Sequence, residues 1–329
     1  MEDLTLAQGF TIISLNSLDS HHMTTAKKMA LRCISAAAIL ELYLAGCFTE
    51  KEERLILNRE VLEQPDILLY QEEVLKHIFK NKVSLEGNLD WWIMKASALS
   101  DKNLKKVEHV ITDSLKGINL LEEIPNLLGC DLFYATANIT MREYRSNSSE
   151  YIRQTEGIRS EVLEEGKLTD EDIVKLWLLR ESACLNEIFA KNELDNVLVR
   201  FNELYQSSRL AMKLFEVCIH HMAETAVKNF LSFKRQLMST PVGTGINYDF
   251  PFIERSQSVF IDTGAMFSDP KMRLEDVLKR LKDYGHEVTV LRAGVVPLLK
   301  IDNILYKAVP DAVMGKIPVH GIRLRRYQI

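Results

Sequence analysis

Two pairs of histidines are the residues of this sequence whose type would suit a metal ion. His21-His22 and His220-His221 are each adjacent in the chain. Neighbouring residues on a helix do not share a face, so neither pair predicts a site with convergent ligands. A surface or capping role is the favoured interpretation, and we predict that no metal is bound.

One triplet, Asp262-Thr263-Gly264, has the composition of a catalytic motif. Aspartic proteases carry this triplet at a strand end, but they need two carboxylates that share a proton, and this chain has one copy. Gly243-x-Gly245 lacks the strand before it and the helix after it that a phosphate-binding loop requires. The G-x-S-x-G, H-E-x-x-H and Walker motifs are absent. We therefore predict no catalytic residue and no cofactor, and we expect a protein that is not an enzyme.

The cysteines also argue against a zinc site. The five cysteines are scattered, with no C-x-x-C pair among them. Most lie in apolar helical context, which is typical of small core side chains in a reducing compartment. They are Cys33, Cys47, Cys130, Cys184 and Cys218.

Two clusters of basic residues could bind an anionic ligand instead. Lys28 and Arg32 are one helical turn apart and so share a face. We predict that the two clusters together form a site for an anionic lipid headgroup. An ordinary solvated helix face is the alternative, because short charge clusters are usually just exposed to solvent. The first cluster is Lys27, Lys28 and Arg32, and the second cluster is Lys102, Lys105 and Lys106. These six are the predicted site residues.

The overall composition is that of a soluble globular protein. The chain has 329 residues, of which 47% are hydrophobic and 26% are charged. This length allows one large domain and a small one. The net charge of −5 gives no general attraction to nucleic acid or anionic lipid, so any such attraction must come from a local patch, and no nucleic-acid partner is expected. The N-terminus lacks a signal-peptide layout.

The elements that must position these residues follow from hydrophobic periodicity. It predicts a mainly α protein, a helical bundle with a short β-hairpin, followed by a small α+β domain. The helices are expected at 4–15, 24–44, 67–79, 89–99, 103–116, 151–164, 170–192 and 196–235. Short β-prone segments are expected at 48–49 and 54–57.

The apolar stretch Ala36–Leu44 is expected to lie inside the bundle, because its side chains cover most of the helix circumference. Glu41 interrupts this stretch and is predicted to be buried and paired. The stretch is too short to cross a bilayer. We therefore expect a cytoplasmic protein that is peripheral to a membrane and does not span it.

The composition changes after Met238. Residues 239–245 are small, polar and rich in turn residues, which is typical of a linker. Strands are then expected at 258–262, 287–291, 295–301 and 304–308, with a helix at 273–284. The predicted division is 1–238 for the helical domain, 239–256 for the linker and 257–329 for a small α+β domain of unknown role.

An ordered series of segments resembles the Golgi phosphoprotein 3 family. The series covers about Leu4 to Met238, and the order is more specific than any one motif. Its members are Leu4-Thr5-Leu6, Ala36–Leu44 with Gly46, the charged stretch Phe48–Leu57, Asp66–Leu69 leading into Glu73–His77, Trp92-Ile93, Val107–Leu121 and Asp170–Phe189. The resemblance implies a phosphoinositide-binding, peripheral membrane protein of helical fold.

The resemblance also implies a headgroup pocket made of one tryptophan and three arginines. The matching positions in this chain hold Ala26, Ser35, Lys105 and Glu108. Lysine replaces the planar fork of arginine poorly, and glutamate repels phosphate. We therefore expect no phosphoinositide selectivity, and at most weak, salt-sensitive binding to anionic lipids in general.

In the same family a hydrophobic β-hairpin follows the helix at Val107–Leu121 and helps insertion into the bilayer. The corresponding apolar residues here are Ile124, Leu127, Leu128, Leu132 and Phe133. Packing of these side chains onto the helices is the alternative. The predicted function is a peripheral membrane adaptor that binds anionic phospholipid surfaces, with other proteins as a further class of partner. The alternative is a soluble protein–protein interaction scaffold, and the oligomeric state is left open.

Overall fold

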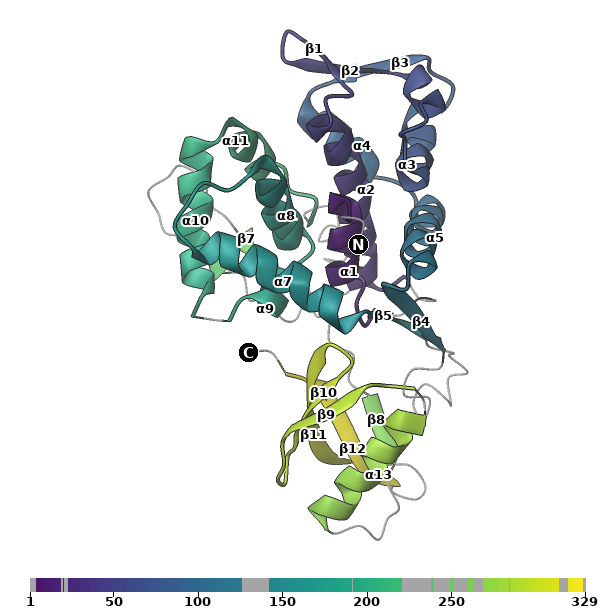
Figure 1. Cartoon of the computed structure of the whole chain (residues 1–329), viewed down its shortest axis with the longest axis vertical. Helices are drawn as coiled ribbons and strands as arrows, with labels where there is room; N and C mark the ends of the chain where they lie inside the picture. Colours follow the sequence, from purple (N-terminus) through teal and green to yellow (C-terminus); the bar gives the residue numbers. More distant parts are fainter. Residues whose placement is uncertain are drawn as a thin grey trace. The chain divides into compact units, whose positions relative to one another are not determined.

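The described residues of this computed structural model fall into two compact units (Figure 1). Unit 1 contains Met1–Leu15, Thr24–Leu120 and Ile152–Ile253, and unit 2 contains Asn16–Met23, Leu121–Tyr151 and Glu254–Ile329. The described residues are 4–18, 20, 23–125, 142–190, 192–220, 238–239, 249–250, 259–262, 269–283, 285–313 and 319–327.

Unit 1 is mainly α-helical. Its three-stranded antiparallel sheet has the order β1-β2-β3, with strands Thr49–Lys51, Arg54–Asn58 and Ser84–Gly87. The short strands β6 (Met238–Ser239) and β7 (Asp249–Phe250) pair with each other. The helices are α1 (Leu6–Ser14), α2 (Thr25–Leu44), η1 (Arg59–Glu63), α3 (Leu69–Phe79), α4 (Leu89–Ser97), α5 (Asp101–Gly117), α7 (Ser148–Leu163), α8 (Asp170–Glu181), α9 (Leu185–Ile188), α10 (Leu194–Ser207) and α11 (Arg209–Phe215). The prediction of a mainly α chain with small β elements is confirmed.

Helix α2 is the central helix of unit 1. Its N-cap Thr24 accepts a hydrogen bond from the Lys27 N–H, and its C-terminal Gly46 has a φ of 72°. The N–H groups of Gly46 and Cys47 bond back to carbonyls of the last turn, which is the Schellman ending that glycine favours. The helix expected at 24–44 is therefore confirmed. The helix packs against α1, α3, α4, α5 and α8, which explains why it is apolar nearly all round.

Two of the predicted helices are each interrupted. The helix expected at 170–192 stops at Glu181, because Ala183 adopts a left-handed φ of 61° and separates α8 from α9. The helix expected at 196–235 stops at Ser207. Ser208 has extended backbone, and its side chain accepts a hydrogen bond from the Ala211 N–H, so it caps α11.

Unit 2 is rich in strands. The hairpin strands β4 (Leu121–Pro125) and β5 (Arg142–Ser146) are antiparallel. The C-terminal residues form a five-stranded antiparallel sheet of order β8-β12-β11-β10-β9. Its elements are β8 (Val259–Asp262), α13 (Pro270–Asp283), β9 (Val288–Arg292), β10 (Leu298–Ile301), β11 (Ile304–Val313) and β12 (Val319–Arg326). The α+β prediction is confirmed in outline, but it missed β12, which pairs with both β11 and β8.

One face of this sheet packs on α13. Val277 and Leu281 of the helix are buried against alternate residues of the strands, including Leu299, Ile322 and Leu324. Alternation is what strands with one covered face require. It leaves the intervening residues on the opposite face.

The compact units differ from the predicted domains. Residues 16–23 and 121–151 group with the C-terminal sheet rather than with the helices. Most of the predicted linker, 239–256, lies outside the described residues. Within the part of the chain that the structure describes, no helix is both long and apolar enough to cross a membrane.

Candidate functional site

The first predicted basic cluster is not a free cationic surface. Lys27 is completely buried, and its Nζ lies 2.7 Å from Oε1 of Glu108 on α5. A buried lysine paired in this way cannot reach a headgroup, so its assignment as a site residue is wrong. The ion pair does confirm that α2 and α5 lie side by side.

Three of the four positions that the resemblance matches to a headgroup pocket lie in the interior of unit 1. Ala26, Ser35 and Glu108 are all buried, and the Ser35 hydroxyl donates to the Leu31 carbonyl at 2.9 Å. Arginines at Ser35 and Glu108 would therefore enter a packed interior rather than rebuild a surface pocket.

The other two residues of the first cluster share one acidic neighbour. Lys28 Nζ lies 2.6 Å from Oδ1 of Asp101, the first residue of α5. Burial lowers the pKa of the half-buried Arg32, and the nearby Asp101 charge opposes that effect. Much of the positive charge at this end of α2 is thus already balanced.

The second cluster remains exposed. Lys102, Lys105 and Lys106 lie on the solvent side of α5, at spacings of three and four residues that share a face. Lys106 has a loose ion pair with Glu73 at 3.7 Å. Lys102 and Lys105 have no ion pair among the described residues, so they are the accessible cations of the predicted site.

The hairpin carries only part of the predicted insertion set. Ile124 is 3% exposed, so its assignment to membrane insertion is wrong: it packs inside unit 2. Leu127, Leu128, Leu132 and Phe133 lie in 126–141, outside the described residues.

A partly buried network ties this hairpin to the C-terminal sheet. Arg145 of β5 contacts Glu122 Oε2 at 2.7 Å and Asp302 Oδ1 at 3.1 Å. His286 Nδ1 lies 2.9 Å from the second oxygen of Asp302, and the Glu287 N–H also donates to Asp302. Burial by itself would raise the pKa of Asp302, but the contacts with His286 and Arg145 hold it below its ordinary value. Sequence reasoning missed this network.

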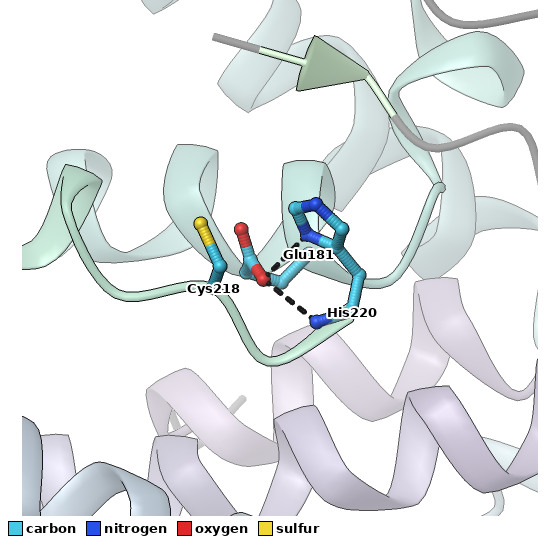
Figure 2. Close-up of side chains that lie close together, drawn as sticks. All are labelled: Glu181, Cys218 and His220. Carbon is cyan, nitrogen blue, oxygen red and sulfur yellow. Dashed lines mark hydrogen bonds and ion pairs between the residues drawn. The ribbon is translucent and has the colours of Figure 1, made fainter. Parts of the chain in front are cut away.

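A second buried network lies in unit 1 at the end of α8 (Figure 2). Glu181 is fully buried, and its Oε2 accepts hydrogen bonds from the N–H groups of Ile219 and His220 at 2.6 and 3.1 Å. His220 Nδ1 lies 2.8 Å from the same oxygen. The other oxygen is paired with Arg180 at 2.8 Å. Burial by itself would raise the pKa of Glu181, but Arg180 and His220 outweigh burial and hold that pKa at about 2.

The side chains in this network include three of the types that bind metal ions. Glu181, Cys218 and His220 offer ligand atoms within 4.8 Å of one another. However, the carboxylate is already saturated by backbone donors, and the Arg180 guanidinium supplies the positive charge that a metal ion would bring. The geometry is that of a clamp that holds the segment after α11 against α8.

The clamp corrects one prediction about histidine. His220 is 3% exposed, so a surface role is wrong, and it has a specific buried partner instead. His21, His22 and His221 lie outside the described residues, as do Thr263, Gly264, Gly243 and Gly245. Asp262 is the last residue of β8.

Glu41 has the partners that its apolar surroundings require. Its carboxylate accepts hydrogen bonds from the Ala7 N–H at 2.7 Å, the Tyr70 hydroxyl at 2.9 Å and the Gln71 side chain at 2.7 Å. Burial raises the pKa of Glu41, and these donors oppose that rise. The prediction of pairing is confirmed, although the side chain is half-buried rather than fully buried.

The comparisons with known proteins leave the family open. The sequence matches no protein-family model, and it matches none of the curated proteins.

Proposed function

We propose that the protein attaches reversibly to anionic membrane surfaces through its β4–β5 hairpin and the exposed lysines of α5. The observation that carries this proposal is the hairpin itself. Its paired strands Leu121–Pro125 and Arg142–Ser146 flank residues 126–141 in the chain, and the sequence of 126–141 contains a single charged residue, Asp131. In a chain that is 26% charged, a sequence with so little charge suits contact with an apolar partner such as a membrane.

We further propose that unit 1 is a helical bundle of the Golgi phosphoprotein 3 type, built around α2. The ordered sequence resemblance supports this, together with the burial of α2 by five other helices. The interior location of the family pocket positions favours general anionic-lipid attraction over selectivity for a phosphoinositide.

The lysines of α5 and the apolar residues of 126–141 are expected to contribute unequally to the free energy of membrane attachment. Each lysine near an anionic surface contributes about 1 kcal/mol, so the three lysines of α5 supply only about 3 kcal/mol. A single weak anchor of this kind gives marginal attachment. Burial of one leucine or phenylalanine contributes about 1.5–3 kcal/mol, so the apolar residues of 126–141 would supply the larger share.

Vesicle sedimentation tests the proposal. The unaltered protein should pellet with phosphatidylserine-containing vesicles at low salt and much less with neutral vesicles. Lys102→Glu with Lys105→Glu should weaken pelleting, and Leu132→Ser with Phe133→Ser should weaken it more. The matched control is Lys51→Glu with Lys82→Glu, two exposed lysines elsewhere on unit 1. No pelleting of the unaltered protein with any anionic vesicle would refute the proposal.

One observation favours the second candidate, a protein–protein scaffold. Strand β9 is an edge of the C-terminal sheet, and Val290, Leu291 and the nearby Val295 are 37%, 52% and 67% exposed. Exposed apolar residues on a sheet edge can take up an extended segment of another chain. A protein that ignores vesicles but loses a concentration-dependent self-association on Leu291→Lys would fit this candidate.

A further inference from the structure

The acidic net charge of the chain conceals a basic segment. Residues 254–329 contain thirteen Lys and Arg against nine Asp and Glu, whereas the whole chain carries −5. Charge averaged over the chain therefore says little about the surface of the C-terminal sheet.

Strand alternation puts five of the six Lys and Arg residues of this sheet on one face; Arg326, which pairs with the buried Tyr306, lies on the other. The buried residues of β10, β11 and β12 face α13, and the residues between them lie on the opposite face, where the described side chains are half-buried or exposed; this face is called the uncovered face below. Strand register then fixes the neighbours. Leu298 of β10 pairs with Arg292 on one side and Lys307 on the other, and Lys307 pairs in turn with Arg325. The cations on this face are Arg292, Lys300, Lys307, Arg323 and Arg325.

Two of these cations are placed directly opposite each other. Lys307 and Arg325 are cross-strand partners, and Arg323 and Lys300 are diagonal neighbours of Lys307. Like charges directly opposite each other destabilise a sheet. Arg323 is paired with Asp311, but Lys300, Lys307 and Arg325 have no ion pair among the described residues. The positive charge of this face is thus left for an external anion.

An aromatic ring accompanies the cations. The Lys307 Nζ lies 4.4 Å from the centroid of the Tyr327 ring, and the Tyr327 N–H donates to the Leu305 carbonyl as β12 ends. A base can stack on such a ring while the neighbouring cations hold the phosphates.

We propose that this uncovered face binds single-stranded nucleic acid through its sugar–phosphate backbone. A flat antiparallel sheet with cations and an aromatic side chain suits splayed, unpaired nucleotides, whereas a duplex is read by an element that enters a groove. The apolar residues of the face, such as Leu298 and Leu305, are only half-exposed, which favours a polyanion over a lipid leaflet. This inference replaces the expectation of no nucleic-acid partner and does not depend on membrane attachment.

Fluorescence anisotropy of the full chain with a labelled oligouridine and a labelled oligothymidine tests the proposal. We expect binding at low salt that weakens steeply as salt increases. The informative variant is Arg325→Glu, because it places a carboxylate opposite Lys307. The variant should raise the melting temperature of the protein, because it replaces a pair of like charges with a pair of opposite charges. It should nevertheless weaken oligonucleotide binding by about tenfold, as expected when repulsion replaces one charge-assisted hydrogen bond. It should also reduce the salt slope by about 0.7 for each phosphate that the variant no longer neutralises.

The matched control is Lys279→Glu, an exposed lysine on α13 with the same change of charge. It should bind like the unaltered protein. Equal weakening in the two variants, or no binding by the unaltered protein at low salt, would overturn the proposal. Loss of vesicle pelleting by Arg325→Glu, with no oligonucleotide binding by the unaltered protein, would overturn it in favour of a membrane-facing sheet.

Discussion

Replacement of Glu181 by glutamine tests the buried clamp of unit 1 most directly. The variant keeps the size of the side chain but removes the charge that faces Arg180. It also puts an amide where Oε2 now accepts hydrogen bonds from the Ile219 N–H, the His220 N–H and the His220 ring. The buried Arg180 would then lose the carboxylate that it faces.

The size of the effect follows from the pKa of Glu181. That pKa is about 2 in the folded protein, against an ordinary value of 4.5, because Arg180 and His220 outweigh the effect of burial. One pKa unit corresponds to about 1.4 kcal/mol, so the ionised carboxylate contributes on the order of 3 kcal/mol at neutral pH. Removal of one partner from a buried ion pair costs about 3–5 kcal/mol. Both arguments predict a loss of about 3–5 kcal/mol in the free energy of unfolding.

The pH dependence has a definite sign. Because folding lowers the pKa of Glu181, the stabilisation is fully present above pH 4.5 and is lost as the pH falls toward 2. The glutamine variant does not titrate at this position. The stability difference between the two proteins should therefore shrink across that pH window.

Urea unfolding followed by tryptophan fluorescence can measure the free energy of unfolding of the two proteins at each pH. Trp177 is fully buried, and its indole N–H donates to the Val217 carbonyl at 3.2 Å, so it reports on the segment that the clamp holds. Glu171→Gln is the matched control on the same helix. Glu171 is exposed and, among the described residues, forms its ion pair with Lys175 one turn away, so its loss should cost less than about 0.5 kcal/mol. A Glu181→Gln variant within about 1 kcal/mol of the unaltered protein, on the scale that surface changes reach, would refute the clamp.

Three further variants test the other buried polar groups. Glu41→Ala should lower the free energy of unfolding by about 1–3 kcal/mol, because the Ala7, Tyr70 and Gln71 donors lose their acceptor. Burial raises the pKa of Glu41, so the stabilisation that Glu41 provides fades as the pH rises above 4.5. The loss of stability in the alanine variant should therefore be larger at pH 4 than at pH 7. A variant as stable as the unaltered protein in urea would mean that Glu41 faces solvent. Lys27→Met should cost about 3–5 kcal/mol, because the buried Glu108 carboxylate loses the ammonium that faces it, whereas Lys27→Met with Glu108→Leu should recover most of that loss. Equal losses in the two proteins would contradict the pairing. Asp302→Asn should speed amide hydrogen exchange in β5, because Arg145 loses one of its two charged partners and keeps only Glu122 of the same hairpin. Unchanged exchange there would mean that the network does not hold the hairpin.

The features that the sequence determined by itself are local. Thr24 and Thr169 cap their helices, and Gly46 ends α2, as expected from residues within one turn of each helix end. The need of Glu41 for partners was also evident, because a carboxylate in an apolar helix must be solvated by something. The missed strand β12 carried a readable signal, since Ile322 and Leu324 alternate with Arg323 and Arg325.

Tertiary structure decided which charges are inside and which are outside. Lys27 and Lys105 have the same residue type and similar helical context, yet Lys27 is buried with Glu108 and Lys105 is exposed. The break after α8 is equally non-local in origin: Ala183 adopts a left-handed conformation that its own side chain disfavours.

The two buried networks that the sequence did not predict join residues that are far apart in the chain. Arg145 and Asp302 are 157 residues apart, and Glu181 and His220 are 39 apart. Such pairs form only after separate segments have been brought together, so no local pattern encodes them. Net charge has the same weakness: it sums over the chain, whereas a partner meets one face of one sheet, and only strand register places Lys307 opposite Arg325.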